Sequence, residues 1–101
     1  IYEVRAKGTK ISDIELSLWP NLYAIDLDNT LVSELDFSNN PDLWIAYFRN
    51  CPINNNEEAL LRMAHSLVDK NEAVGTIYVD PNSVLVIEAI CNTKNWYVQS
   101  Q

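Results

Sequence analysis

The chain has 101 residues, of which 48% are hydrophobic and 21% charged, with two glycines and four prolines. At this length we expect a single domain with one core over residues 1–101, and the composition excludes collagen, low-complexity tails and gross disorder. No apolar run approaches the length of a membrane span, and the first residues show no signal-peptide pattern. These features predict a cytoplasmic protein.

The formal net charge is −7, from 14 acidic and 7 basic residues, and the acids are unevenly distributed. Between Lys10 and Arg49 there is no lysine or arginine, whereas this interval contains seven acidic residues: Asp13, Glu15, Asp26, Asp28, Glu34, Asp36 and Asp42. A field of this sign repels nucleic acid and anionic membranes and attracts basic proteins. We therefore expect a protein partner, with neither nucleic acid nor a membrane.

The first part of the chain alternates between apolar and polar residues in a way that is typical of β-strands. The predicted strands cover residues 2–6, 13–18, 22–27 and 30–37. Residues 19–21 and 28–29 separate them with proline, asparagine and aspartate, which favour turns. Because side chains alternate across a strand, the carboxylates of this region are expected to lie together on the solvent face of the sheet.

The remaining residues predict two helices and three strands. Asn40 as N-cap and Pro41 at the first helical position predict a helix that ends near Asn50, and its apolar residues 43–48 indicate burial. A second helix is predicted over residues 57–71, and an antiparallel meander over residues 74–79, 84–91 and 94–99. The expected fold is α+β: a mainly antiparallel sheet with two consecutive helices packed on one face, in the order β-β-β-β-α-α-β-β-β, without internal repeats.

The cysteines indicate no metal site. Cys51, Cys91 and the lone His65 are too few for a Cys/His zinc site. The two thiols are either free in a reducing compartment or joined in one disulfide, and both alternatives remain open. No metal and no cofactor are expected.

The segment Leu-Tyr-Ala-Ile-Asp-Leu-Asp-Asn-Thr-Leu, residues 22–31, resembles the first motif of haloacid-dehalogenase-like phosphatases. The resemblance implies that Asp26 attacks phosphorus and that Asp28 acts as acid/base beside Mg²⁺. The later motifs of that family are missing, because no paired acids follow on a later strand. We expect no enzymatic activity, and a magnesium-dependent phosphatase fragment is the alternative.

In size, charge and expected architecture the whole chain resembles bacterial immunity proteins, including those of contact-dependent growth inhibition systems. The resemblance implies that the protein neutralises a cognate basic toxin domain, expected to be a nuclease, by occluding its active site with an acidic surface. The predicted partner-binding residues are Glu15, Trp19, Asp26, Asp28, Glu34, Asp36 and Asp42. A phage anti-defence protein or DNA mimic, with the same carboxylates spaced like phosphates, is a further alternative.

Overall fold

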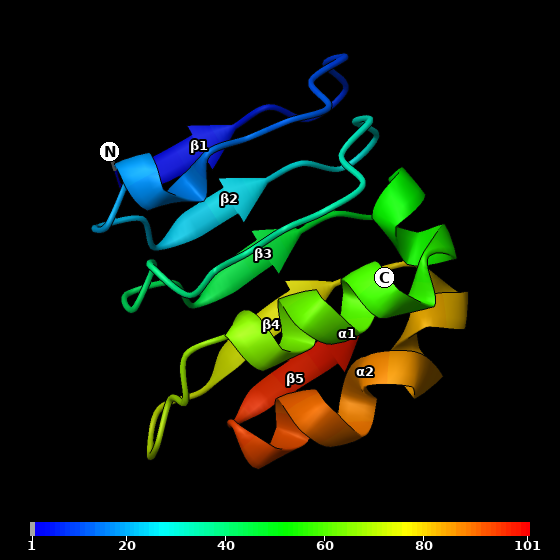
Figure 1. Cartoon of the computed structure of the whole chain (residues 1–101). Coiled ribbons are helices and arrows are strands. Elements are labelled where there is room, and N and C mark those ends of the chain that lie inside the picture. The colour runs from blue at the N-terminus through cyan, green and yellow to red at the C-terminus, as the bar shows by residue number, and fades with distance from the viewer. Residues whose placement is uncertain (1) are drawn as a thin grey trace.

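The computed structural model describes residues 2–101 and contains one five-stranded sheet in which every strand runs parallel to its neighbours (Figure 1). The strands are β1 (Glu3–Arg5), β2 (Ala24–Asp26), β3 (Ile45–Tyr47), β4 (Gly75–Tyr78) and β5 (Trp96–Gln99). Their order in the sheet is their order in the sequence, so each strand pairs with the strands that precede and follow it in the chain.

The strands repeat at a fixed spacing. Val4, Ile25, Ala46, Ile77 and Val98 are aligned across the sheet, which places successive strands 21, 21, 31 and 21 residues apart. Around the second and third strands the pattern Leu-x-x-Ile-x-Leu, residues 22–27, recurs as Leu-x-x-Ala-x-Phe, residues 43–48. A recurrence at such an interval is typical of repeat architectures, in which neighbouring units bury a continuous core.

The first three strands leave the sheet through the same left-handed turn. Gly8, Asn29 and Asn50 are 21 residues apart and have φ angles of 76°, 61° and 55°. Glycine and asparagine are the residues that tolerate this conformation best. The amide Nδ2 of Asn50 donates to Oδ1 of Asn29 at 2.7 Å, so successive turns are also joined to each other.

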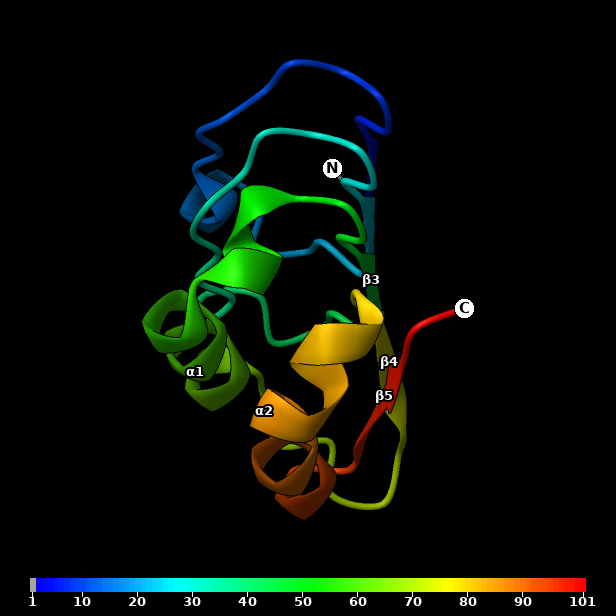
Figure 2. The same ribbon diagram turned by 90° about the vertical axis from the view of Figure 1, so that its right-hand side faces the viewer.

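The segments that return from one strand to the next all lie on one side of the sheet, and Figure 2 shows the helices there. The first two returns are largely extended and include only the short 3-10 helix η1 (Leu16–Leu18). The later returns contain the second 3-10 helix and the two α-helices: η2 (Pro52–Asn55), α1 (Glu57–Ser66) and α2 (Pro81–Thr93). The core fills the space between the sheet and these returns and includes the fully buried Phe48, Leu60 and Trp96.

The predicted antiparallel sheet is wrong, because all four strand pairings are parallel. The turns at residues 19–21 and 28–29 looked like hairpin connections, but they lead into and out of return segments. The return after β2 alternates like a strand because Val32, Leu35 and Phe37 point into the core while the residues between them are exposed. The prediction that the chain lacks internal repeats is also wrong, because aligned strand residues recur 21 residues apart.

Two predicted elements have the opposite secondary structure. Residues 40–50, expected to be helical, contain β3, and residues 84–91, expected to be a strand, lie within α2. Other predictions are confirmed: β1, β2, β4 and β5 lie within the predicted strands 2–6, 22–27, 74–79 and 94–99. The predicted helix 57–71 contains α1, which ends earlier, at Ser66.

Two further observations concern the sequence predictions. Cys51 and Cys91 are both buried and both free, so the disulfide alternative is not realised. Over residues 2–101, no helix combines the length and the apolar character that crossing a membrane requires.

Candidate protein-binding surface

One face of the sheet is free of helices in the part of the chain that the structure describes (Figure 2). Parallel sheets are normally covered on both faces, so an uncovered face is a distinctive feature. The register arranges its side chains in two rows, each with one residue from every strand. One row contains Glu3, Ala24, Ile45, Thr76 and Tyr97, and the other contains Arg5, Asp26, Tyr47, Tyr78 and Gln99. We call this surface the open face.

Where β3 and β4 end, the open face carries two tyrosines, and an arginine two residues beyond β3 completes a cluster with them. The rings of Tyr47 and Tyr78 stack with their centroids 4.6 Å apart and their planes 11° from parallel. The guanidinium carbon of Arg49 lies 5.5 Å from the centroid of Tyr47 and 5.2 Å from that of Tyr78. Both distances are within the range of cation–π attraction. Tyrosine and arginine are also the side chains that contribute most often to binding hot spots.

The buried side chain of Asp28 fixes the position of Arg49 in this cluster. Its Oδ2 accepts from Nε and Nη2 of Arg49 at 3.0 and 2.5 Å, and its Oδ1 accepts from the Arg49 backbone N–H at 2.7 Å. The Asp28 side chain is 4% exposed and that of Arg49 is 32% exposed. A paired, hydrogen-bonded arginine of this kind loses little freedom when a partner binds, which favours affinity.

The electrostatics of the cluster agree with this geometry. The hydrogen bonds with Asp28 raise the pKa of Arg49. Burial lowers this pKa and offsets the rise only in part. Burial and the neighbouring Tyr78 raise the pKa of Tyr47 above its usual value. The raised pKa of Tyr47 keeps its hydroxyl group protonated at neutral pH, beside the guanidinium of Arg49 that pairs with Asp28.

A second row of aromatic rings lies where the strands begin. Tyr23 stacks on Trp44 with centroids 6.5 Å apart and planes 8° from parallel, and Tyr2 lies 6.4 Å from Tyr23. Their exposed fractions are 66%, 37% and 46% for Tyr2, Tyr23 and Trp44. Exposed aromatic side chains in a contiguous row are typical of interaction surfaces.

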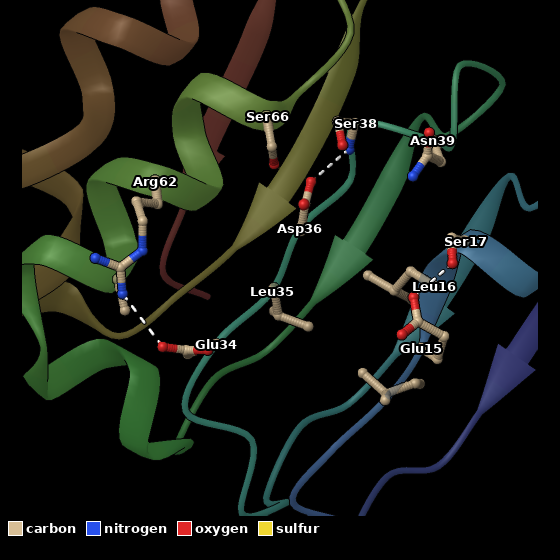
Figure 3. A pocket seen from close by; sticks show the side chains of 12 residues that line it. Glu15, Leu16, Ser17, Glu34, Leu35, Asp36, Ser38, Asn39, Arg62 and Ser66 are labelled. Atoms are coloured by element: carbon tan, nitrogen blue, oxygen red, sulfur yellow. Dashed lines mark hydrogen bonds and ion pairs between the residues drawn. The ribbon is translucent and has the colours of Figure 1, made fainter.

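A groove of about 530 Å³ lies on the opposite side of the sheet, between the first two returns and α1 (Figure 3). It contains three of the predicted site residues. Glu34 pairs with Arg62 at 3.3 Å, Glu15 accepts from Ser17 Oγ, and Asp36 accepts from the Ser38 backbone N–H at 2.9 Å. The hydrogen bonds from Ser38 lower the pKa of Asp36.

The structure separates the predicted partner-binding residues. Asp26 lies on the open face, Asp28 is buried beneath Arg49, and Asp42 is exposed in the turn before β3. Glu15, Glu34 and Asp36 line the groove on the other side of the sheet. Trp19 is half-buried and packs against the core. The base-free interval therefore does not form one continuous acidic surface.

This separation also bears on the two alternatives. A phosphate mimic needs its carboxylates along one face, whereas these occupy two faces and one buried position. In the phosphatase-like segment, both carboxylate oxygens of Asp28 accept hydrogen bonds from Arg49.

Sequence reasoning missed the cluster on the open face, because Tyr47 was assigned to a buried helix and Arg49 to its end. The signal that would have found it is the 21-residue repeat: Pro20, Leu22 and Asn29 recur as Pro41, Leu43 and Asn50. Aligning these units places Asp26 beside Tyr47 and Asp28 beside Arg49. Comparison of the chain with protein-family models, curated proteins and solved structures found no match.

Proposed function

We propose that this protein is a binding domain that takes a protein partner on the open face of its sheet. The observation that carries the proposal is the stack of Tyr47, Tyr78 and Arg49, on the middle strands of a face that no helix within residues 2–101 covers. Binding energy at protein interfaces is concentrated in a few central residues of these types, surrounded by side chains that exclude water. Tyr97 and Ile45 on the open face fit the surrounding role.

Within this function we propose a basic partner, as expected for an immunity protein that captures a toxin domain. The net charge of −7 supports this narrower role, because a field of that size attracts a cationic protein over a distance and speeds encounter. Asp26 adds a carboxylate next to Tyr47 within the open face. The groove carboxylates then contribute to attraction at long range, while the open face makes the contact.

Site-specific photo-crosslinking tests which face binds. A photoreactive residue at Tyr97, 57% exposed on the open face, is expected to cross-link the partner in an extract of the source organism. The same residue at Leu85, 88% exposed on α2, is the matched control and is expected to remain without a cross-link. Cross-links from position 85 in place of position 97 would contradict the proposed surface.

Substitution then tests the cluster with the partner in hand. Tyr78→Ala is expected to weaken binding by roughly thirtyfold, as at a hot spot of about 2 kcal/mol, whereas Leu85→Ala leaves the affinity unchanged. If the partner is basic, Asp26→Lys slows association and added salt slows the wild type. An association rate that ignores both changes would refute the basic partner but leave the open face as the binding surface.

A further inference from the structure

The two ends of the sheet are finished differently. At one end, α2 packs over β5, so Trp96 is fully buried and Val98 is 9% exposed. At the other end, Val4 and Ala6 are only partly buried, although the equivalent residues of the next repeat, Ile25 and Leu27, are 1% and 0% exposed. The core is therefore covered beside β5 and uncovered beside β1.

The backbone of β1 has a free side as well. Tyr2 O accepts from Tyr23 N–H, and Ala6 N–H donates to Asp26 O, so the even-numbered residues of this strand bond to β2. In a parallel ladder, alternate residues direct their peptide groups to the same neighbour. The peptide groups of Glu3 and Arg5 consequently point away from the sheet, where no strand within residues 2–101 pairs with them.

The free edge is complementary to itself. If a second β1 runs antiparallel about a two-fold axis at Val4, Glu3 faces Arg5 of the second copy, and Arg5 faces its Glu3. These are the residues whose N–H and C=O groups point outward, so the two pairs exchange four backbone hydrogen bonds. Both side chains lie on the open face, where they already pair within one strand at 2.8 Å. The dimer thus sets two opposite-charge cross-strand pairs side by side.

The same register covers the exposed apolar residues. On the inner side, Val4 meets Val4 of the second copy, and the register sets Tyr2, 66% exposed in the single chain, opposite Ala6 at each end of the contact. Cross-strand contacts between aromatic or β-branched side chains stabilise antiparallel pairs. A two-fold contact is also closed: each copy pairs its free β1 edge with that of the other, and this edge cannot recruit further copies into a fibre.

We propose that a second copy of this chain docks on β1, and that the two sheets join through antiparallel β1 strands into one sheet of a two-fold symmetric dimer. This interface uses the β1 edge of the open face, two strands away from Tyr47 in β3, so the proposed function and the dimer can fail independently.

Sedimentation velocity over a concentration series tests the dimer. The wild type is expected to approach twice its mass of 11.5 kDa as the concentration rises. Arg5→Glu opposes glutamate to glutamate at both cross-strand pairs and is expected to raise the dissociation constant about tenfold. Glu3→Arg opposes arginine to arginine and has a similar effect.

The double swap Glu3→Arg with Arg5→Glu restores opposite charges and is expected to recover the wild-type dissociation constant. The matched control is Glu88→Arg, which changes the net charge by the same amount as Glu3→Arg at an exposed position of α2 and leaves the dimer intact. Glu3→Pro removes one outward N–H and no donor to β2, so it is expected to give a monomer with unchanged circular dichroism.

A wild type that remains at 11.5 kDa at every concentration would overturn the proposal. So would a dimer that Arg5→Glu leaves unchanged, or a double swap no better than either single substitution, because the copies would then meet through another surface.

Discussion

The two halves of the sheet are stabilised in different ways. From β1 to β3, the returns are largely extended, and polar contacts join successive turns: Asn50 with Asn29, Arg49 with Asp28, and Cys51 with the carbonyl of Leu27. From β3 to β5, the returns contain α1 and α2, which pack on each other, and α2 also packs on β5. Both halves nevertheless keep one continuous row of inward residues from Val4 to Val98. The comparison shows that the inward pattern of each strand sets the sheet, while the return segment is free to change.

The largest expected effect is on the half of the sheet from β1 to β3, where polar contacts join the turns. Arg49→Met leaves the buried Asp28 carboxylate without its partner and is expected to lower the free energy of unfolding by about 3 kcal/mol in urea denaturation. Adding Asp28→Asn removes the uncompensated charge and is expected to recover part of this loss. The control is Arg62→Met, whose pair with Glu34 is exposed and contributes at most about 0.5 kcal/mol. Equal losses from Arg49→Met and Arg62→Met would show that the buried pair does not stabilise the turns.

A substitution at Gly75 tests the half of the sheet from β3 to β5, where helices pack. A Cβ atom there would lie 2.6 Å from ring carbons of Trp96, which is fully buried and lacks space to move. Gly75→Ala is therefore expected to cost about 2 kcal/mol, by the same denaturation measurement. Gly8→Ala, where the Cβ meets nothing within 4 Å but φ is +76°, is expected to cost about 1 kcal/mol. The reverse order would contradict the close packing of Trp96 on β4.

In the same half of the sheet, the buried thiol of Cys91 predicts a loss of stability at alkaline pH. Burial raises the pKa of the Cys91 thiol from 9.0 to about 12. Below pH 9 the thiol is protonated in both states, whereas between these values only the unfolded chain releases the proton. The free energy of unfolding should therefore fall by about 1.4 kcal/mol per pH unit in this window. Cys91→Ala is expected to flatten the pH profile by that amount, and an unchanged slope would show that the thiol is not shielded.

The smallest expected effect concerns the left-handed turn at Asn50. Asn50→Gly and Asn50→Ala both remove the hydrogen bond to Asn29, but only alanine resists a φ of 55°. Asn50→Ala is expected to be less stable than Asn50→Gly by about 1 kcal/mol, measured as a difference between their unfolding free energies. Equal stabilities would indicate that the turn relaxes away from the left-handed conformation.

Local patterns in the sequence were sufficient for four strands and for α1, because alternation and capping residues are local properties. They failed where two local signals coincide. The segment 43–48 looks apolar all round, since Leu43, Ala46 and Phe48 enter the core while Trp44, Ile45 and Tyr47 lie on the other side of the strand. In α2 the apolar run hid a helix in which Ile87 and Cys91, four residues apart, are buried and Leu85 is exposed.

The direction of the strands and the position of the site depend on contacts between distant residues. The charge count could not show that Asp28 pairs with Arg49, or that Asp26 and Glu34 lie on opposite sides of the sheet. A 21-residue periodicity was present in the sequence and would have given the parallel order of β1 to β3 and the position of Asp26 beside Tyr47, but it is detectable only when whole segments are aligned. It would not have given Tyr78, because β4 follows β3 after 31 residues. Reversing all the predicted acids to lysine is therefore also expected to destabilise the fold, because it replaces the buried Asp28 that pairs with Arg49.

The sequential strand order has an evolutionary consequence. Since each strand touches only its chain neighbours, a unit can be duplicated or lengthened without rethreading the rest of the polypeptide. The step from β3 to β4 is ten residues longer than the others and gains η2 and α1 within it, yet the alignment of Ala46 with Ile77 is preserved. The fold therefore provides a route by which such a chain can acquire new segments while the arrangement of its existing strands is retained.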